Sequence, residues 1–227
     1  MFRIKCFLFG VVLSVCLAHI PVYAQPKAGL FGSMEIRSSN MKNFGKWTEM
    51  WRRHNLPKTD EVLPEDAATQ RRCIGEFRLQ CSREAWESFV SEQDTTDSAA
   101  LLKAVNQYMN RSPYILDPVN WGIPDYWATP DEFFLKDGDC EDYAISKYIT
   151  LKRLGYDPKK MRLVILQDEN LRVAHAVLAV DIDGVFHILD NQVDAVLPDN
   201  KILHYRPVYS INEENWWLHR ANRFGRK

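Results

Sequence analysis

The feature that most constrains this fold is a two-residue turn, Asp183-Gly184, between two runs of strand-forming residues. The run before the turn is VAHAVLAVDI (173–182), and the run after it is VFHILD (185–190). Asp-Gly is a preferred pair for a tight hairpin, because its backbone accepts the positive φ angles that such turns require. The two runs are therefore predicted to pair as antiparallel strands, with Ile182 opposite Val185.

The register of this hairpin places a histidine beside a carboxylate. Counting back from the turn, Val177 lies opposite Asp190, and His175 lies opposite Gln192 if the pairing extends that far. These four share one face, since side chains alternate along a strand. His175 and Asp190 are then diagonal neighbours, with Cα atoms about 7–8 Å apart. The pattern predicts a histidine oriented by an acid, an ordinary half-buried histidine being the alternative. His187 points to the opposite face.

The chain before the hairpin is predicted to be mainly helical. Asp139 to Leu154 is the clearest helix, because Gly155 ends it and Pro158 forbids continuation. Thr129-Pro130-Asp131-Glu132 opens a shorter helix with the residues of a capping box. Further helices are predicted in 43–55, 82–90 and 98–111, an ordered loop in 112–128, and further strands in 161–167 and 204–212. Helices followed by a meander of strands predict an α+β fold.

The first residues have the pattern of a secretory signal peptide. Arg3 and Lys5 precede an apolar run, and Val22-Tyr23-Ala24 resembles a cleavage site. Residues 1–24 are therefore predicted to be a cleaved signal, and 25–227 a single exported domain. An uncleaved anchor is the alternative, although the apolar run is short for a membrane span. The formal net charge of −1 gives no electrostatic support for a nucleic-acid partner.

Three cysteines follow the predicted signal: Cys73, Cys81 and Cys140. An exported compartment permits disulfides, and Cys73 can pair with Cys81 if Gly75 bends the chain. On one continuous helix the two would lie about 12 Å apart, which is too far to bridge. Two separate buried thiols are the alternative. The odd cysteine, Cys140, is a candidate reactive thiol.

Cys140 stands among acids in DGDCED (137–142), at the start of the predicted helix. Negative neighbours keep a thiol protonated, which suits neither a nucleophile nor a metal ligand. A carboxylate about 4 Å from a thiolate costs about 4 kcal/mol at an effective dielectric of about 20, or about three pKa units. A nucleophilic Cys140 therefore requires something that offsets these acids.

Three segments carry a family resemblance: WGIPDYWATPDEFFLKDGDCEDYAISKYITLKRLGY (121–156), AHAVLAV (174–180) and LDN (189–191). Together they resemble the bacterial transglutaminase-like cysteine proteinases. The resemblance implies a papain/transglutaminase-like fold, in which N-terminal helices pack on an antiparallel sheet and the nucleophile begins a helix. It also implies a cysteine endopeptidase whose nucleophile, base and orienting acid are Cys140, His175 and Asp190.

LapG-type members of this family imply further expectations. They need calcium, held by carboxylates next to the nucleophile, which here are Asp139, Glu141 and Asp142. A bound Ca²⁺ would offset their charge, because this hard cation takes six to eight oxygen ligands. Such members are periplasmic, clip a large surface adhesin and are restrained by an inner-membrane receptor for cyclic-di-GMP. The segment CIGEFRLQC (73–81) departs from the LapG pattern and indicates a related subgroup.

Two other functions stay open. The same thioester chemistry would make an amine acyltransferase if an amine replaced water. A non-catalytic calcium-binding module is the other, in which the acids merely favour the positive end of a helix. For a protease, the N–H of Cys140 is one candidate oxyanion donor. Trp121 or Trp127 is a candidate for the second, although each is also typical of a wall or a core.

Overall fold

The computed structural model describes residues 29–57 and 83–221. The predicted signal peptide and the Cys73–Cys81 pair lie outside these residues. The described helices are α1 (Gly45–His54), α3 (Arg83–Ser91), α4 (Ser98–Asn110), α5 (Asp117–Asn120), α6 (Pro130–Lys136) and α7 (Cys140–Arg153). The strands are β1 (Met34–Ser38), β2 (Met161–Asp168), β3 (Val173–Ile182), β4 (Val185–Leu189), β5 (Leu197–Pro198), β6 (Tyr205–Ile211) and β7 (Trp216–Arg220).

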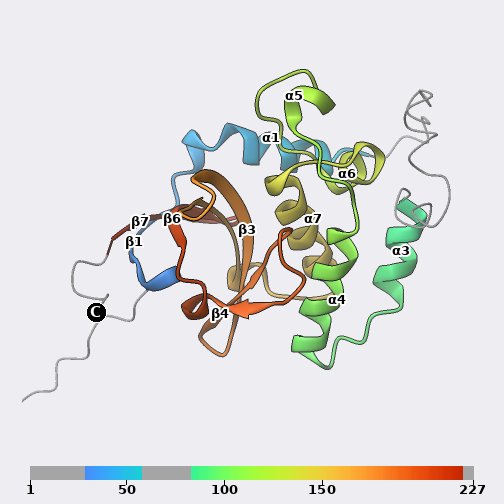
Figure 1. Ribbon diagram of the computed structural model, residues 1–227. Helices are drawn as coiled ribbons and strands as arrows, with labels where there is room; N and C mark the ends of the chain where they lie inside the picture. The colour runs from blue at the N-terminus through green and yellow to red at the C-terminus, as the bar shows by residue number, and fades with distance from the viewer. Residues whose placement is uncertain (1–28, 58–82, 222–227) are drawn as a thin grey trace, which may run out of the picture.

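The predicted α+β fold is confirmed. The strands form one antiparallel sheet in the order β1-β7-β6-β2-β3-β4-β5. The helices gather to one side of it, with α7 packed on β3 and β2, and with α4 and α6 packed on α7 (Figure 1). This arrangement aims the N-terminus of α7 at one end of β3.

The hairpin register is also confirmed, but the ladder is shorter than the sequence allows. Ile182 pairs with Val185 around the Asp183-Gly184 turn, and both turn residues have positive φ. The last β3–β4 pair is Leu178–Leu189. His175 therefore does not pair with Gln192, because the chain leaves the sheet after Leu189.

Helix α7 is buried on all sides over most of its length. Every residue from Asp142 to Leu151 is buried, so the core surrounds this part of the helix. The predicted capping box of α6 is present, formed by Thr129 and Glu132. A second capping box, formed by Asp139 and Asp142, starts α7.

The other face of the sheet has its own apolar cluster, which contains Leu30, Phe31, Val164, Leu166, Val177, Ala179, Ile188 and Tyr205. The edge pair β1 and β7 was not predicted, because Met34–Ser38 is short and its burial has no clean alternation. The β2–β6 register shifts where Leu166 pairs with Pro207, because proline has no backbone N–H to donate to the ladder. Within residues 29–57 and 83–221, no helix is long and apolar enough to span a membrane.

Candidate active site

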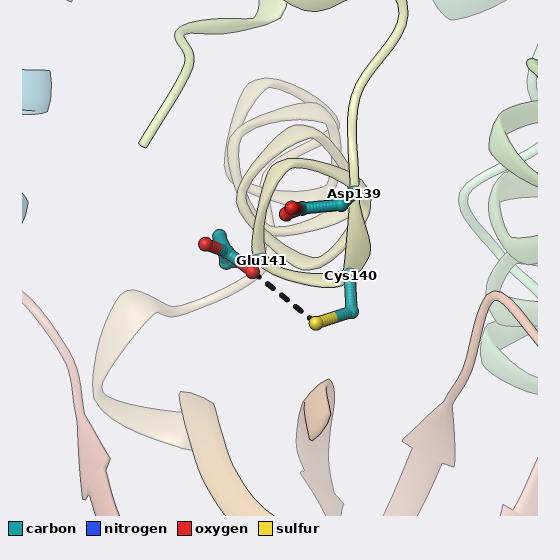
Figure 2. Close-up of side chains that lie close together, drawn as sticks. All are labelled: Asp139, Cys140 and Glu141. Carbon is teal, nitrogen blue, oxygen red and sulfur yellow. Dashed lines mark hydrogen bonds between the residues drawn. The ribbon is translucent and has the colours of Figure 1, made fainter. Parts of the chain in front are cut away.

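Cys140 is the first residue of α7, and it follows the N-cap residue Asp139. Its sulfur is turned toward its neighbour and donates a hydrogen bond to Glu141 Oε2 at 3.2 Å (Figure 2). Burial raises the pKa of the Cys140 thiol, and the Glu141 charge, the Glu141 hydrogen bond and the Asp139 charge raise it further. The acids therefore act on the thiol in the way the sequence predicts.

The opposing interaction comes from the strand that carries His175. The backbone N–H of Ala176 donates a hydrogen bond to the Cys140 sulfur and lowers the thiol pKa. Ala176 comes two residues before Leu178, so it lies in the part of β3 that no longer pairs with β4. The structure thus brings Cys140 next to the residue that follows His175, although no hydrogen bond joins the sulfur to the His175 ring within the described residues.

His175 and Asp190 are in direct contact, as the hairpin geometry predicts. His175 Nε2 lies 2.9 Å from Asp190 Oδ1, and both side chains are buried. Burial alone would raise the pKa of Asp190, but the hydrogen bond and charge of His175 and the hydrogen bonds of Tyr205 and Gln192 outweigh it and lower the pKa. Asp190 is therefore ionised, and its bond to Nε2 leaves Nδ1 as the ring nitrogen available for chemistry.

Two further donors hold the Asp190 carboxylate, and hairpin counting missed both. The Tyr205 hydroxyl donates to Asp190 Oδ2 at 2.5 Å, and the N–H of Gln192 donates to Oδ1 at 2.9 Å. Tyr205 comes from β6, which the sequence gives no reason to place here. Its ring also lies 5.8 Å from the His175 ring, so it restrains both members of the pair.

The loop that follows Asp190 is fastened to α4 by two asparagines. Asn110 Nδ2 donates to the Asp190 carbonyl at 2.9 Å, and Asn106 Nδ2 donates to the Val193 carbonyl at 2.9 Å. They stand four residues apart, so they share one face of the helix. The sequence shows this spacing but not which groups the two side chains bind, because their partners are backbone carbonyls about 80 residues away.

The acids around Cys140 are joined by two that the sequence did not single out. Carboxylate oxygens of Asp117, Asp125 and Glu141 lie within 4.8 Å of one another, as do ligand atoms of Asp139, Cys140 and Glu141. Burial raises the pKa of Glu141 to about 8, and a hydrogen bond and the charge of Asp139 add to the rise. Burial likewise raises the pKa of Asp117 to about 6. These shifts mark an anionic cluster in which Lys46, paired with Asp125, offsets only part of the negative charge.

Asp142 differs from Asp117 and Asp139 because both of its carboxylate oxygens, and not only one, accept a backbone N–H. Oδ1 accepts from the N–H of Ala128 at 2.7 Å, and Oδ2 accepts from the N–H of Asp139 at 3.3 Å. A Cβ atom at Gly138 would lie 2.3 Å from Oδ2, so only glycine allows the carboxylate to reach back. Asp142 still forms a possible ligand group with Asp117 and Asp139. Its two hydrogen bonds, however, stabilise the turn that precedes Cys140.

Comparison with known proteins places this geometry in a family. The family model of the bacterial transglutaminase-like cysteine proteinases matches residues 72–222. The chain belongs to this family. Bacterial transglutaminase-like cysteine proteinases are thiol proteases, so the protein is a cysteine protease of the transglutaminase-like superfamily.

Solved structures of a family member agree with this assignment. LapG from Legionella pneumophila is 31% identical, with 67% of this chain and 81% of that chain covered and a TM-score of 0.55. Its calcium-bound structure is 28% identical, with 70% and 91% covered and a TM-score of 0.56. The EGTA-treated structure of LapG is 30% identical, with 69% and 80% covered and a TM-score of 0.56. A comparison with curated proteins found no match.

Proposed function

We propose that this protein is a calcium-dependent periplasmic protease that hydrolyses a peptide bond through Cys140, His175 and Asp190. One observation carries the proposal. His175 on β3 and Asp190, which follows β4, are buried 2.9 Å apart, and the backbone N–H of Ala176, the residue after His175, is bonded to the sulfur of Cys140 at the start of α7. Nucleophile, base and orienting acid in this relation are the arrangement that thiol acyl transfer requires.

In the proposed reaction each group has one task. The Cys140 sulfur attacks the peptide carbonyl, and His175 Nδ1 takes the thiol proton and then gives one to the leaving amine. Asp190 holds Nε2, so it fixes the tautomer and stabilises the imidazolium. The positive end of α7 and the N–H of Ala176 favour the thiolate. Water then attacks the thioester, with His175 as the base.

A calcium ion fits the acids beside Cys140. Asp117 Oδ1 and Asp139 Oδ1 are buried and receive no N–H or hydroxyl donor within the described residues. Two such oxygens, beside Glu141 and Asp125, are the hard ligands that Ca²⁺ prefers. When bound, the ion would offset the charge that holds the thiol protonated. We assign the ligands to Asp139 and Glu141 with Asp117 and Asp125. Asp142 could bind the ion only through the oxygen lone pairs that do not accept its two backbone N–H hydrogen bonds.

The proposed location is supported by the export-signal pattern of the sequence, and the proposed substrate and partner are supported by the family resemblance. Residues 1–24 have the pattern of a cleaved export signal, which would deliver the mature domain to the periplasm. We propose a surface adhesin as the substrate and an inner-membrane cyclic-di-GMP receptor as the regulator, on the family resemblance. An exported compartment also permits the Cys73–Cys81 disulfide.

The test is cleavage by the purified mature chain. An unfolded protein reporter and an N-terminal adhesin segment are incubated with the enzyme in calcium or in EGTA. We expect cleavage only in calcium, and none with Cys140→Ala or His175→Ala. Calcium affinity, measured by calorimetry, should fall in Asp117→Asn and stay unchanged in the surface variant Glu214→Gln. Calcium binding without cleavage of either protein, or joining of an amine to the reporter, would refute hydrolysis.

A further inference from the structure

The oxyanion of acyl transfer needs hydrogen-bond donors that point at it, and one is already present. Cys140 is the first residue of α7, so its backbone N–H has no carbonyl one turn earlier in the helix to bind. The tryptophans that the sequence suggests for the second donor have other contacts. The Trp121 ring packs at a tilt on Tyr126 with ring centroids 4.3 Å apart, and its Nε1 is buried without an acceptor among the described residues, whereas Trp127 packs against Trp47 in the core.

Tyr114 is held beside the nucleophile from two sides. Its backbone forms a bridge with Gly138, and the N–H of Ile115 donates to the Gly138 carbonyl at 2.9 Å. Its ring is stacked near Tyr143, in the first turn of α7, with an interplanar angle of 22°. The side chain is nevertheless half-exposed. Tyr114 therefore has a fixed position beside the start of α7, with part of its side chain open to solvent.

The Tyr114 hydroxyl interacts with the Cys140 sulfur and can donate a hydrogen bond. The backbone bridge of Tyr114 to Gly138 and the stacking of its ring near Tyr143 place the phenol beside the start of α7, where Cys140 acts on it through charge and hydrogen bonding and where the charges of Asp139 and Glu141 also act on it. Burial raises the pKa of Tyr114, and these charges raise it further. The phenol consequently keeps its proton at any physiological pH, which is the state in which it donates.

We propose that Tyr114 is a catalytic residue that donates a hydrogen bond to the oxyanion, together with the backbone N–H of Cys140. The proposal rests on Cys140 being the nucleophile of the proposed function. As the sulfur–carbon bond forms, the carbonyl π electrons move to oxygen and the thiol proton goes to His175. The hydroxyl then turns from the sulfur to this oxygen, and releases it when the carbonyl re-forms and the leaving group departs. The phenol proton is not transferred.

Tyr114→Phe tests this, because it removes the hydroxyl and keeps the ring beside Tyr143. Two reactions of Cys140 are compared at one pH. Acylation by p-nitrophenyl acetate forms an oxyanion and releases p-nitrophenolate, which is followed as a burst. Alkylation by iodoacetamide displaces iodide at a saturated carbon and forms none. Tyr156→Phe, at the far end of α7, is the matched control, and Cys140→Ala gives the background from other groups.

We expect Tyr114→Phe to slow acylation by about 10²-fold, the usual effect of losing one oxyanion donor, and to change alkylation by less than about threefold. Tyr114→His, which returns a donor, should recover part of the acylation rate. An unchanged acylation rate, an equal fall in both reactions, or faster acylation from an unblocked sulfur would overturn the proposal. So would acylation undiminished in Cys140→Ala. Failure of protein cleavage, with the acylation difference intact, would refute the proposed protease function and leave the donor assignment standing.

Discussion

Replacing Glu141 by glutamine measures how strongly the acids hold the Cys140 thiol protonated. The substitution preserves the length of the side chain and removes one negative charge, 3.2 Å from the sulfur. Glu141 has a pKa of about 8, below that of the thiol. The carboxyl therefore ionises first, and in wild type the thiol then titrates beside a full charge.

The separation sets the size of the effect. At 3.2 Å and an effective dielectric of about 20, the charge costs the thiolate about 5 kcal/mol, or about four pKa units. Full screening by water would reduce this to about one pKa unit. Without calcium, the thiol pKa of Glu141→Gln should thus fall by one to four units relative to wild type. With calcium the order should reverse, because only wild type keeps the full set of ligands.

The assay is the rate of Cys140 alkylation by iodoacetamide across pH 5–10, read by mass spectrometry of the peptide that contains Cys140. We expect Glu141→Gln to react faster than wild type in EGTA above about pH 8, where Glu141 of the wild type is ionised. In calcium near pH 7 we expect it to react more slowly than wild type. Glu214→Gln, which removes a surface charge paired with Lys159, should match wild type in both. A pH–rate profile in EGTA that is identical for Glu141→Gln and wild type would refute the claim that Glu141 suppresses the thiolate.

Three other substitutions give sharp expectations. Asp190→Asn should lower kcat by about 10²–10⁴-fold, because the imidazolium loses its counter-charge; an unchanged kcat would contradict the triad. Tyr205→Phe should cost about 1.5–3 kcal/mol of unfolding free energy, measured in urea, because it removes a hydrogen bond to the ionised Asp190. Burial lowers the pKa of Lys147 from 10.5 to about 7 against the charges of Asp190 and Asp194. Below pH 7 Lys147 of the folded chain therefore carries a buried charge. Between about pH 7 and pH 10 this lysine is neutral in the folded chain but still protonated in the unfolded chain, so the free energy of unfolding rises with pH over that range. Lys147→Met should abolish that rise and add about 3–5 kcal/mol at pH 6, as melting curves at several pH values would show.

Much of the site was predictable because its parts are local or are linked by a short turn. The Asp-Gly pair determines the register of β3 on β4, and the register determines that His175 and Asp190 share a face. The position of Cys140 at a helix start follows from the helix that ends at Gly155. These inferences span few residues, and backbone geometry transmits them without knowledge of the remaining chain.

Other contacts have no local cause. Tyr205 and Asn110 reach Asp190 from a distant strand and a distant helix, and Asp117 meets Asp139 across a loop. Their partners are selected by how α4, β6 and the 112–128 segment pack, and many packings satisfy the same apolar periodicity. The sequence alone therefore determined that a helix begins at Cys140 and that His175 lies beside Asp190. The tertiary structure decided what surrounds them, because burial and charge at this site are sums over residues that meet only after the core has formed.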